Sequence, residues 1–410
     1  MSVLIACSYE VGGLPFRMAE VLNRRGLPVW YLSVAPPTGG HDSTRFHYGE
    51  RHEPWDISER IGGGASPREV VRRLAAARRE LDIRAAFATG AEAHLLGRAG
   101  LPYHYWCYGS DLDWQAFAPL WPEGHPLLRR AWTFSRFALG LRRRQRRSLR
   151  DAVAVMVAPY QKPALDRIRA GAPLFALPHL LAVDDRARLL ERRAAERDAV
   201  RRIVGAERFI FSAARHVWCG ALAAQADNKG NDVVIRAFAR WRGSGGDRAV
   251  RLVLVRKGPD TEASARLVAE LGLADAVTWL GEMNRDELGR LYRGADLCLG
   301  QFGTPVITYA MLEPLAEGTP CLSHFVFPHP GVPGYPEPPP GMAPRDPEGL
   351  AREIGLLLGD EAAREDAAAR SWAWVRDHCS EERFVEAFRE IFPLEAWPAF
   401  GARPGDLAMS

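Results

Sequence analysis

Short apolar segments alternate with amphipathic segments along most of this chain, and this alternation constrains the fold more than any other feature. The apolar run Val3–Ser8 is followed by a helical pattern at Phe16–Arg25, which Gly26 ends, and then by the strand-like run Pro28–Val34. A strand, a helix and a second strand in this order predict a parallel sheet with helices on both faces. The predicted fold class is therefore α/β, with doubly wound, Rossmann-like sheets.

The alternation occurs in two successive series, which predicts two domains. A chain of 410 residues suits two domains of roughly 150–200 residues each better than one core. The charged helix Asp184–Arg202 leads into the second series, so we place the domains at 1–182 and 183–380, with 381–410 packing back on the first. Later strands are predicted at Ile83–Thr89, Pro102–Tyr108, Ala152–Ala158, Leu174–Pro178, Phe209–Ala213, Val250–Arg256, Val277–Leu280, Leu297–Gly300 and Pro320–Ser323.

Composition excludes several classes of protein. With 47% hydrophobic and 25% charged residues the chain is typical of globular proteins, and a net charge of +4 is too small to argue for nucleic acid. The six cysteines are scattered without a Cys-x-x-Cys pair, which fits a reduced, cytoplasmic protein. Lysine occurs only at positions 162, 229 and 257 among many arginines, so a lysine that opens a helix indicates a positional requirement.

Charged residues and glycines mark the strand–helix junctions of the second series. Arg215 follows one strand, Lys229 and Gly230 open the next helix, Gly258 and Gly281 leave two further strands, and Glu313 lies near the start of a helix. Two cationic side chains can form ion pairs with a diphosphate, and a carboxylate can accept hydrogen bonds from ribose hydroxyls. The pattern therefore suits a bound nucleoside diphosphate.

The order and the amino-acid sequences of these segments resemble the C-terminal domain of retaining glycosyltransferases of family 4 (group 1), which have the GT-B fold. The resemblance is strongest over Phe209–Leu358 and includes the run Gly341–Ala351. It implies two Rossmann-like domains facing across a cleft, with acceptor in the N-terminal domain and donor in the C-terminal domain. It also implies a diphosphate clamp at Arg215 and Lys229, ribose binding at Glu313, and a base or sugar loop at Gly258, Gly281, Glu282, Met283, Gly303 and Thr304.

Two features of the N-terminal half extend the resemblance. Gly12 and Gly13 follow the first strand, where glycines either form a plain tight turn or let backbone N–H groups approach an anion, which the resemblance implies is the donor phosphate. Tyr108 and Asp111 belong to Tyr-Gly-Ser-Asp, which is similar to the family's His-Gly-Ser-Asp. Tyrosine is a poor base at neutral pH, so Asp111 is the better proton acceptor of the two, unless it only caps the following helix.

The chain also departs from the family's pattern. Eight positions before the residue that corresponds to Glu313, the family has the first glutamate of its motif beside the donor sugar, and here Pro305 stands in its place. The segment 216–227 lengthens the usual spacing between the clamp residues. Glu317 is interpreted as an ordinary helix-surface residue, and His94 and His104 as structural histidines with satisfied hydrogen bonds. The departures leave the donor sugar, base and acceptor open.

The predicted activity is a retaining, metal-independent transfer of a sugar from a nucleotide-diphosphate sugar to a small-molecule, glycan or lipid acceptor, without a further cofactor. The arginine run 142–150 is interpreted as a solvated helix face, with peripheral attachment to an anionic inner membrane as the alternative and no nucleic-acid partner. Three other functions are weighed: a GT-B sugar-nucleotide epimerase, a degenerate nucleotide-sugar-binding protein, and a hydride-transferring Rossmann enzyme. The last would require Gly-x-Gly-x-x-Gly, which this first loop lacks.

Overall fold

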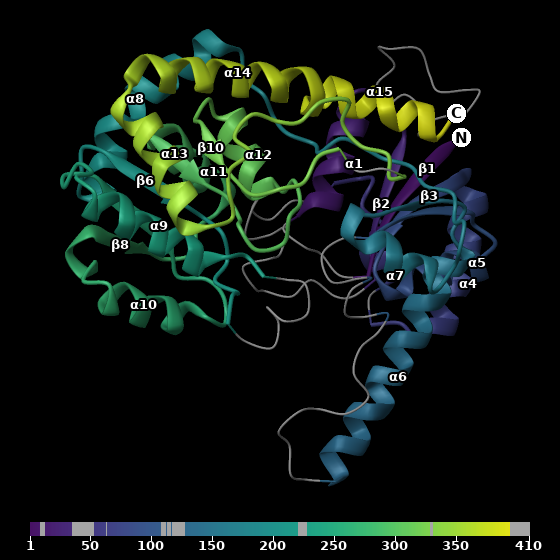
Figure 1. The fold of residues 1–410 in the computed structure, drawn as a ribbon. Coiled ribbons are helices and arrows are strands. Elements are labelled where there is room, and N and C mark those ends of the chain that lie inside the picture. Colours follow the sequence, from purple (N-terminus) through teal and green to yellow (C-terminus); the bar gives the residue numbers. More distant parts are fainter. Residues whose placement is uncertain are drawn as a thin grey trace. The chain divides into compact units, whose positions relative to one another are not determined.

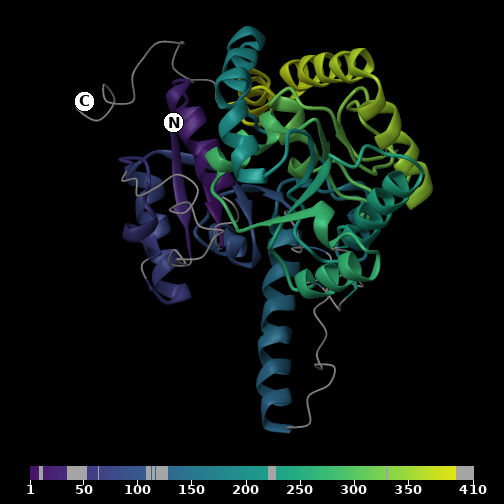
Figure 2. The same ribbon diagram turned by 90° about the vertical axis from the view of Figure 1, so that its left-hand side faces the viewer.

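The computed structural model describes residues 1–8, 13–34, 53–62, 64–107, 112, 116, 128–219, 228–328 and 331–393, except for the side chains of 128–137. These residues form two compact α/β units, shown in two views in Figures 1 and 2. Unit 1 comprises Met1–Leu177, Gly331–Gly334 and Val385–Ser410, and unit 2 comprises Pro178–Pro330 and Tyr335–Phe384. The helix α15 (Glu381–Ile391) begins in unit 2 and continues into unit 1.

Unit 1 contains a five-stranded parallel sheet in the order β2-β1-β3-β4-β5. Leu174, predicted to begin a further strand, makes only an isolated bridge to Val155, because the chain runs beside β5 for a single residue pair. The elements are β1 (Ser2–Cys7), α1 (Leu14–Arg24), β2 (Val29–Ser33), α3 (Ser58–Ile61), α4 (Pro67–Glu80), β3 (Ile83–Thr89), α5 (His94–Arg98), β4 (Tyr103–Trp106), α6 (Leu128–Asp151), β5 (Val155–Met156) and α7 (Lys162–Asp166).

Unit 2 contains a second five-stranded parallel sheet, in the order β10-β9-β6-β7-β8. Helix α9 contacts α10 and α13, helix α11 contacts α8 and α12, and α12 also contacts α14. The elements are α8 (Arg186–Val204), β6 (Phe209–Ser212), α9 (Asn231–Gly243), β7 (Arg251–Val255), α10 (Thr261–Glu270), β8 (Val277–Leu280), α11 (Arg285–Gly294), β9 (Leu297–Leu299), α12 (Tyr309–Ala316), β10 (Cys321–Leu322), α13 (Pro347–Gly359) and α14 (Glu361–Cys379).

The core of unit 2 lies on both faces of its sheet. Ile210 and Leu252 pack in one apolar cluster, whereas their neighbours Phe211 and Val253 pack in another. Because successive side chains of a strand point to opposite faces, this division shows that both faces of the sheet are covered. Such burial explains why the strands are continuous apolar runs rather than alternating ones.

Local signals in the sequence fix where several helices begin. Ser66 caps α4 by accepting from the Glu69 N–H group, and Asp346 caps α13 by accepting from Gly349 at 2.7 Å. Asn284 and Glu287 form a reciprocal capping box at the start of α11. These bonds satisfy backbone donors that helices leave unpaired, and they set the positions at which α11 and α13 leave the sheet.

Candidate functional site

The strand order of unit 2 has a topological switch point between β6 and β9. These strands are neighbours, but the chain continues from β6 toward β7 on one side, while β10 lies beyond β9 on the other. In open α/β sheets the loops diverge at such a switch point, and ligands bind there. Arg215 follows β6, and Gly303 and Thr304 follow β9, so the predicted donor residues flank this point.

Two glycines allow the loops around Lys229 and Thr304 to interlock. Gly230 has a left-handed φ of +67° before α9, and a Cβ there would lie 2.6 Å from the Gly303 nitrogen. Thr304 donates from its backbone and its hydroxyl to the Asn228 carbonyl, at 2.8 and 3.1 Å. The Phe302 N–H group donates to the Lys229 carbonyl at 2.9 Å. The structure therefore brings Lys229, Gly303 and Thr304 together.

The segment that carries Arg215 is joined to the same helix start. Lys229 donates its backbone N–H to the Val217 carbonyl at 2.7 Å. The buried Asn231 side chain accepts from Val217 at 3.1 Å and donates to the Ala214 carbonyl at 3.2 Å. Arg215 itself is exposed and Lys229 is half-buried. The two predicted clamp residues thus share one hydrogen-bonded frame.

Gly258 brings the loop after β7 against the residues that follow β6. Its φ is +114°, and a side chain there would overlap the His216 backbone and approach the Arg215 Cγ atom to 2.8 Å. His216 donates its N–H to the Lys257 carbonyl at 2.6 Å, and its Nδ1 atom lies 2.8 Å from the Ser264 hydroxyl. Burial lowers the pKa of His216 to about 4, so its ring is neutral at pH 7.

The predicted base or sugar loop follows β8. The Glu282 carboxylate lies 3.3 Å from the Lys257 ammonium, so another of the three lysines also belongs to this edge of the sheet. Met283 packs on the apolar cluster around Phe209 and Phe211. Gly281 has open space around it and an ordinary φ, so the backbone does not require glycine at this position.

Glu313 lies in α12 and is held by charge. The Arg285 Nη1 atom is 2.6 Å from Glu313 Oε1, and the Tyr292 hydroxyl donates weakly to Oε2 at 3.4 Å. Glu317 differs from its expected role as a surface residue. Its carboxylate is 2.6 Å from Arg293, a buried arginine that also pairs with Glu196, so the half-buried Glu317 belongs to an ion-pair network around this arginine.

Position 305, where the family's first glutamate is replaced by proline, lies in the loop between β9 and α12. The buried Gln301 organises this loop: its amide donates to the Thr304 carbonyl at 3.1 Å, and its own carbonyl accepts from the Ser323 hydroxyl at 2.9 Å. Sequence reasoning missed Gln301, Asn228, Asn231 and Arg285. The two asparagines flank Lys229-Gly230, which was the available signal, whereas nothing local indicated the roles of Gln301 and Arg285.

The corresponding edge of unit 1 is described only in part. Gly12, Tyr108 and Asp111 lie outside the described residues, as do 220–227 of the lengthened loop. Gly13 has a φ of +66° and caps α1. His94 is satisfied as expected, with Nδ1 at 2.8 Å from the Ala91 carbonyl, but buried His104 Nδ1 has no hydrogen-bond partner among the described residues. The His104 ring packs edge-on against Phe175 and Phe392, so its expected structural role stays a prediction.

Hydrogen bonds to Tyr105 and Ser8 join the strand ends in the described part of this unit 1 edge. The Tyr105 hydroxyl accepts from the Gly90 N–H group at 2.9 Å and from the Gln145 amide at 2.6 Å. The Ser8 hydroxyl accepts from the Glu92 N–H group at 2.9 Å. Gly90 has a φ of +89°, and a side chain there would overlap Ser8. The ends of β1, β3 and β4 are thereby fixed to one another.

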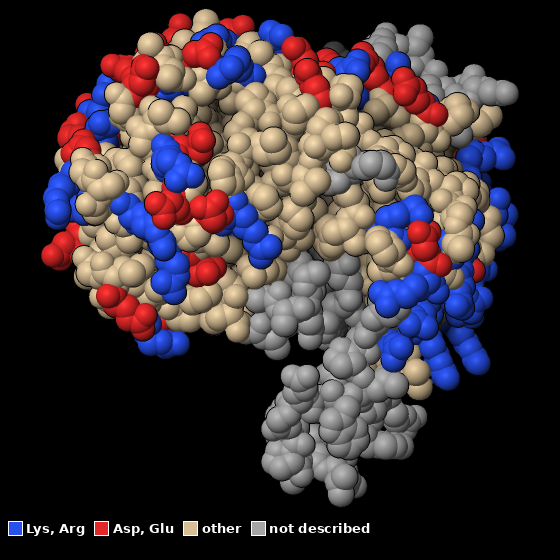
Figure 3. Space-filling model, in the orientation of Figure 1, with Lys and Arg blue, Asp and Glu red and all other residues tan. Residues whose placement is uncertain are grey.

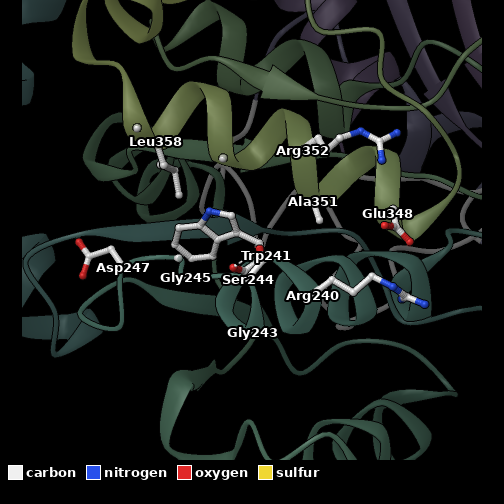
Figure 4. A pocket seen from close by; sticks show the side chains of 13 residues that line it. Arg240, Trp241, Gly243, Ser244, Gly245, Asp247, Glu348, Ala351, Arg352 and Leu358 are labelled. Carbon is white, nitrogen blue, oxygen red and sulfur yellow. Dashed lines mark hydrogen bonds between the residues drawn. The ribbon is translucent and has the colours of Figure 1, made fainter.

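A cavity of about 740 Å³ in unit 2 is separate from these residues (Figure 4). It lies where α9 ends and is lined by Trp241, Asp247 and one face of α13. Lys229 precedes the opposite end of α9, and none of the predicted donor residues lines the cavity. Within the described part of the chain, no three His, Cys, Asp or Glu side chains are grouped as metal ligands.

Comparison with known proteins finds a family match over the segment that contains the predicted donor residues. Residues 213–360 match the family model described as "Glycosyl transferases group 1". The D-inositol 3-phosphate glycosyltransferase of Nocardia farcinica is 29% identical over 192 residues, which cover 43% of this chain and 40% of the relative's length. The predicted resemblance to group 1 glycosyltransferases is thereby confirmed for residues 213–360, whereas the retaining mode and the residue roles stay predictions.

Solved structures confirm the fold over almost the whole chain. HepE of Anabaena, in complex with UDP and glucose, has a TM-score of 0.60 at 14% identity over 96% of this chain and 100% of its own. Sucrose-phosphate synthase of Thermosynechococcus elongatus has a TM-score of 0.63 at 16% identity over 96% and 98%. The chain thus has the α/β architecture of the GT-B glycosyltransferases, with two Rossmann-like units.

Proposed function

We propose that this chain, which carries a group 1 glycosyltransferase domain at residues 213–360, transfers a sugar from a nucleotide-diphosphate sugar to an acceptor hydroxyl. One observation carries the proposal: the frame around the β6–β9 switch point joins the segments of Arg215 and Lys229 to the loop of Gly303 and Thr304. Unit 2 would hold the donor, with Glu313 on the ribose, and unit 1 would hold the acceptor. The Anabaena neighbour, solved with UDP and glucose, supports this type of donor.

The chemistry requires little covalent participation from the protein. The bond between the sugar C1 and the β-phosphate oxygen breaks, and its electron pair stays on that oxygen. The acceptor oxygen bonds to C1 on the same face, and its proton passes to the leaving phosphate, so that the configuration is retained. Arg215 and Lys229 would stabilise the charge that develops on the diphosphate, a role that makes a divalent metal unnecessary.

The acceptor side of the proposal includes a small molecule, a glycan or a lipid. Figure 3 shows lysine and arginine side chains gathered on unit 1 where α7 and the described end of α6 lie. Burial, and then the charges of Arg142, Arg150 and Arg167, hold the pKa of Arg146 below its usual value. This excess of positive charge supports peripheral attachment of a cytoplasmic protein to anionic lipid.

No helix among the described residues combines the length and hydrophobicity that spanning a bilayer requires. Sedimentation with phosphatidylglycerol vesicles tests the proposed attachment. We expect binding that high salt abolishes and that phosphatidylcholine vesicles do not support. Equal binding to both kinds of vesicle would contradict an electrostatic attachment.

Incubation with UDP-, GDP- and ADP-sugars, with and without an acceptor panel that includes D-inositol 3-phosphate, tests the activity. A transferase releases the nucleoside diphosphate quickly only when an acceptor is present and otherwise hydrolyses the donor slowly. An epimerase converts the sugar nucleotide without an acceptor. Nucleotide binding with neither reaction would instead favour a binding protein and would count against the proposed activity.

A further inference from the structure

The Glu313 carboxylate is fixed before any nucleotide binds. Arg285 contacts one oxygen at 2.6 Å, and Tyr292 donates to the other at 3.4 Å. Both charged side chains are mostly shielded, with 16% of Glu313 and 27% of Arg285 exposed. An ion pair of this geometry in a half-buried place restricts the carboxylate to few orientations.

Arg285 also connects two parts of the predicted nucleotide site. It is the first residue of α11, and Asn284, the cap of this helix, follows directly after the predicted loop Gly281–Met283. Its guanidinium reaches Glu313 in α12, the helix that follows the loop of Gly303 and Thr304. The ion pair therefore ties the loop after β8 to the helix that carries the proposed ribose ligand.

The carboxylate keeps hydrogen-bonding capacity after these contacts. An ionised carboxylate accepts only, and its two oxygens offer about four lone-pair positions. The structure uses one on Oε1 for Arg285 and one on Oε2 for Tyr292. The remaining positions can each accept from one of two adjacent hydroxyl groups, which is what a ribose presents and a 2′-deoxyribose does not.

We infer that Arg285 is a positioning residue that orients Glu313 toward both ribose hydroxyls, so that the site selects ribonucleoside over 2′-deoxyribonucleoside diphosphate donors. This inference rests on the proposed function. A site built to bond a hydroxyl loses affinity for the analogue that lacks it, because its polar group then has no partner. Prior fixation by Arg285 reduces the ordering that binding must otherwise supply.

Calorimetric titration of Arg285→Met tests the inference, because methionine keeps much of the apolar stem and removes the guanidinium. The ligands are UDP, GDP, ADP and CDP and their 2′-deoxy counterparts. For the diphosphate that binds, we expect the wild type to prefer the ribose form about tenfold and Arg285→Met to lose most of that preference, mainly through weaker ribose binding. Arg290→Met is the matched control, since Arg290 lies exposed on the same helix, 4.0 Å from Glu196.

The possible outcomes separate the inference from its alternatives. An unchanged preference for the ribose form in Arg285→Met would overturn it. If the affinities for the ribose and deoxyribose forms both fall equally, the ion pair is purely structural, and the inference is overturned as well. The double variant Arg285→Met with Glu313→Gln should bind the ribonucleoside diphosphate no more weakly than Glu313→Gln alone. Additive losses of binding free energy would contradict the inference. If the wild type binds none of these nucleotides, the proposed function itself fails and the inference falls with it.

Discussion

The two units share a sheet architecture, and the parts of their carboxyl edges that the structure describes differ in the contacts that hold them. Both have five parallel strands with a switch point beside their first strand, β1 in one and β6 in the other. In unit 2 that edge carries paired charges, such as Lys257 with Glu282 and Arg285 with Glu313. In the described edge of unit 1, hydrogen bonds to Tyr105 and Ser8 join the strand ends. Topology therefore fixes where a ligand can bind, while the loop residues decide which ligand chemistry is favoured.

The largest expected effect concerns the interlocked glycines of unit 2. Gly230→Ala adds a Cβ atom 2.6 Å from the Gly303 nitrogen, at a φ of +67°. We expect a loss of roughly 3 kcal/mol in the free energy of unfolding, from left-handed strain and a clash with rigid backbone. Urea unfolding of the variant and the wild type measures this loss in the free energy of unfolding.

Gly171→Ala is the matched control in unit 1, because Gly171 has the same φ of +67° and nothing within 4 Å of its added Cβ atom. Strain alone should cost about 1 kcal/mol there. Equal losses in the two variants would show that the close approach of Gly230 to Gly303 contributes nothing.

The next effect is a pH dependence that arises beside the charged edge. Burial holds the pKa of His216 at about 4, while the unfolded chain titrates near 6.5. The unfolded state therefore binds more protons between these values, so stability is lost as the pH falls from about 6.5 toward 4. Between about pH 8 and pH 5 this histidine should cost roughly 2 kcal/mol.

Buried His179, whose pKa is also about 4, adds a loss in the same direction. Urea unfolding at several pH values should therefore show a smaller acid loss for His216→Gln than for the wild type. The same slope in both proteins would contradict the assignment of His216 as a buried neutral ring.

The smallest effect belongs to the described edge of unit 1. Tyr105→Phe leaves the Gly90 N–H group and the Gln145 amide without their shared acceptor. Because both lie in a buried environment, we expect a loss of about 1.5 kcal/mol. A Tyr105→Phe protein with unchanged urea midpoint would show that these bonds do not hold the edge together.

The sequence predicts the architecture well because strands that are buried on both faces leave long apolar runs. It also predicts a site at Arg215, Lys229 and Glu313, since charges at strand–helix junctions stand out in such a pattern, and these roles stay predictions. It cannot predict the ion pair between Arg285 and Glu313, which are 28 positions apart and meet only after β9 and β8 take their places in the sheet. It misassigns Glu317 for the same reason, because its partner Arg293 approaches from another helix.

The interlock of Gly230 with Gly303 shows a further limit. Both positions contain glycine, but glycine occurs in many loops, and only the fold shows that two backbones meet here. The conformation of the loop that contains Pro305 could not be predicted either, because the buried Gln301 that organises this loop has no distinctive spacing in the sequence.

The central claim is that Arg215 and Lys229 form the diphosphate clamp of unit 2, and nucleotide binding tests it most directly. We would record thermal unfolding of the wild type and of Arg215→Ala with Lys229→Ala, in the presence of UDP, GDP, ADP, CDP or dTDP. A ligand at about 100 times its dissociation constant stabilises a protein by about 2.7 kcal/mol, which is a visible shift. Arg240→Ala with Lys162→Ala removes the same two side-chain types elsewhere and serves as the control.

The account predicts that one nucleoside diphosphate raises the melting temperature of the wild type and of the control, and that the Arg215 and Lys229 double variant loses this shift. An equal shift in the double variant, or no shift of the wild type with any of the five nucleotides, would contradict it.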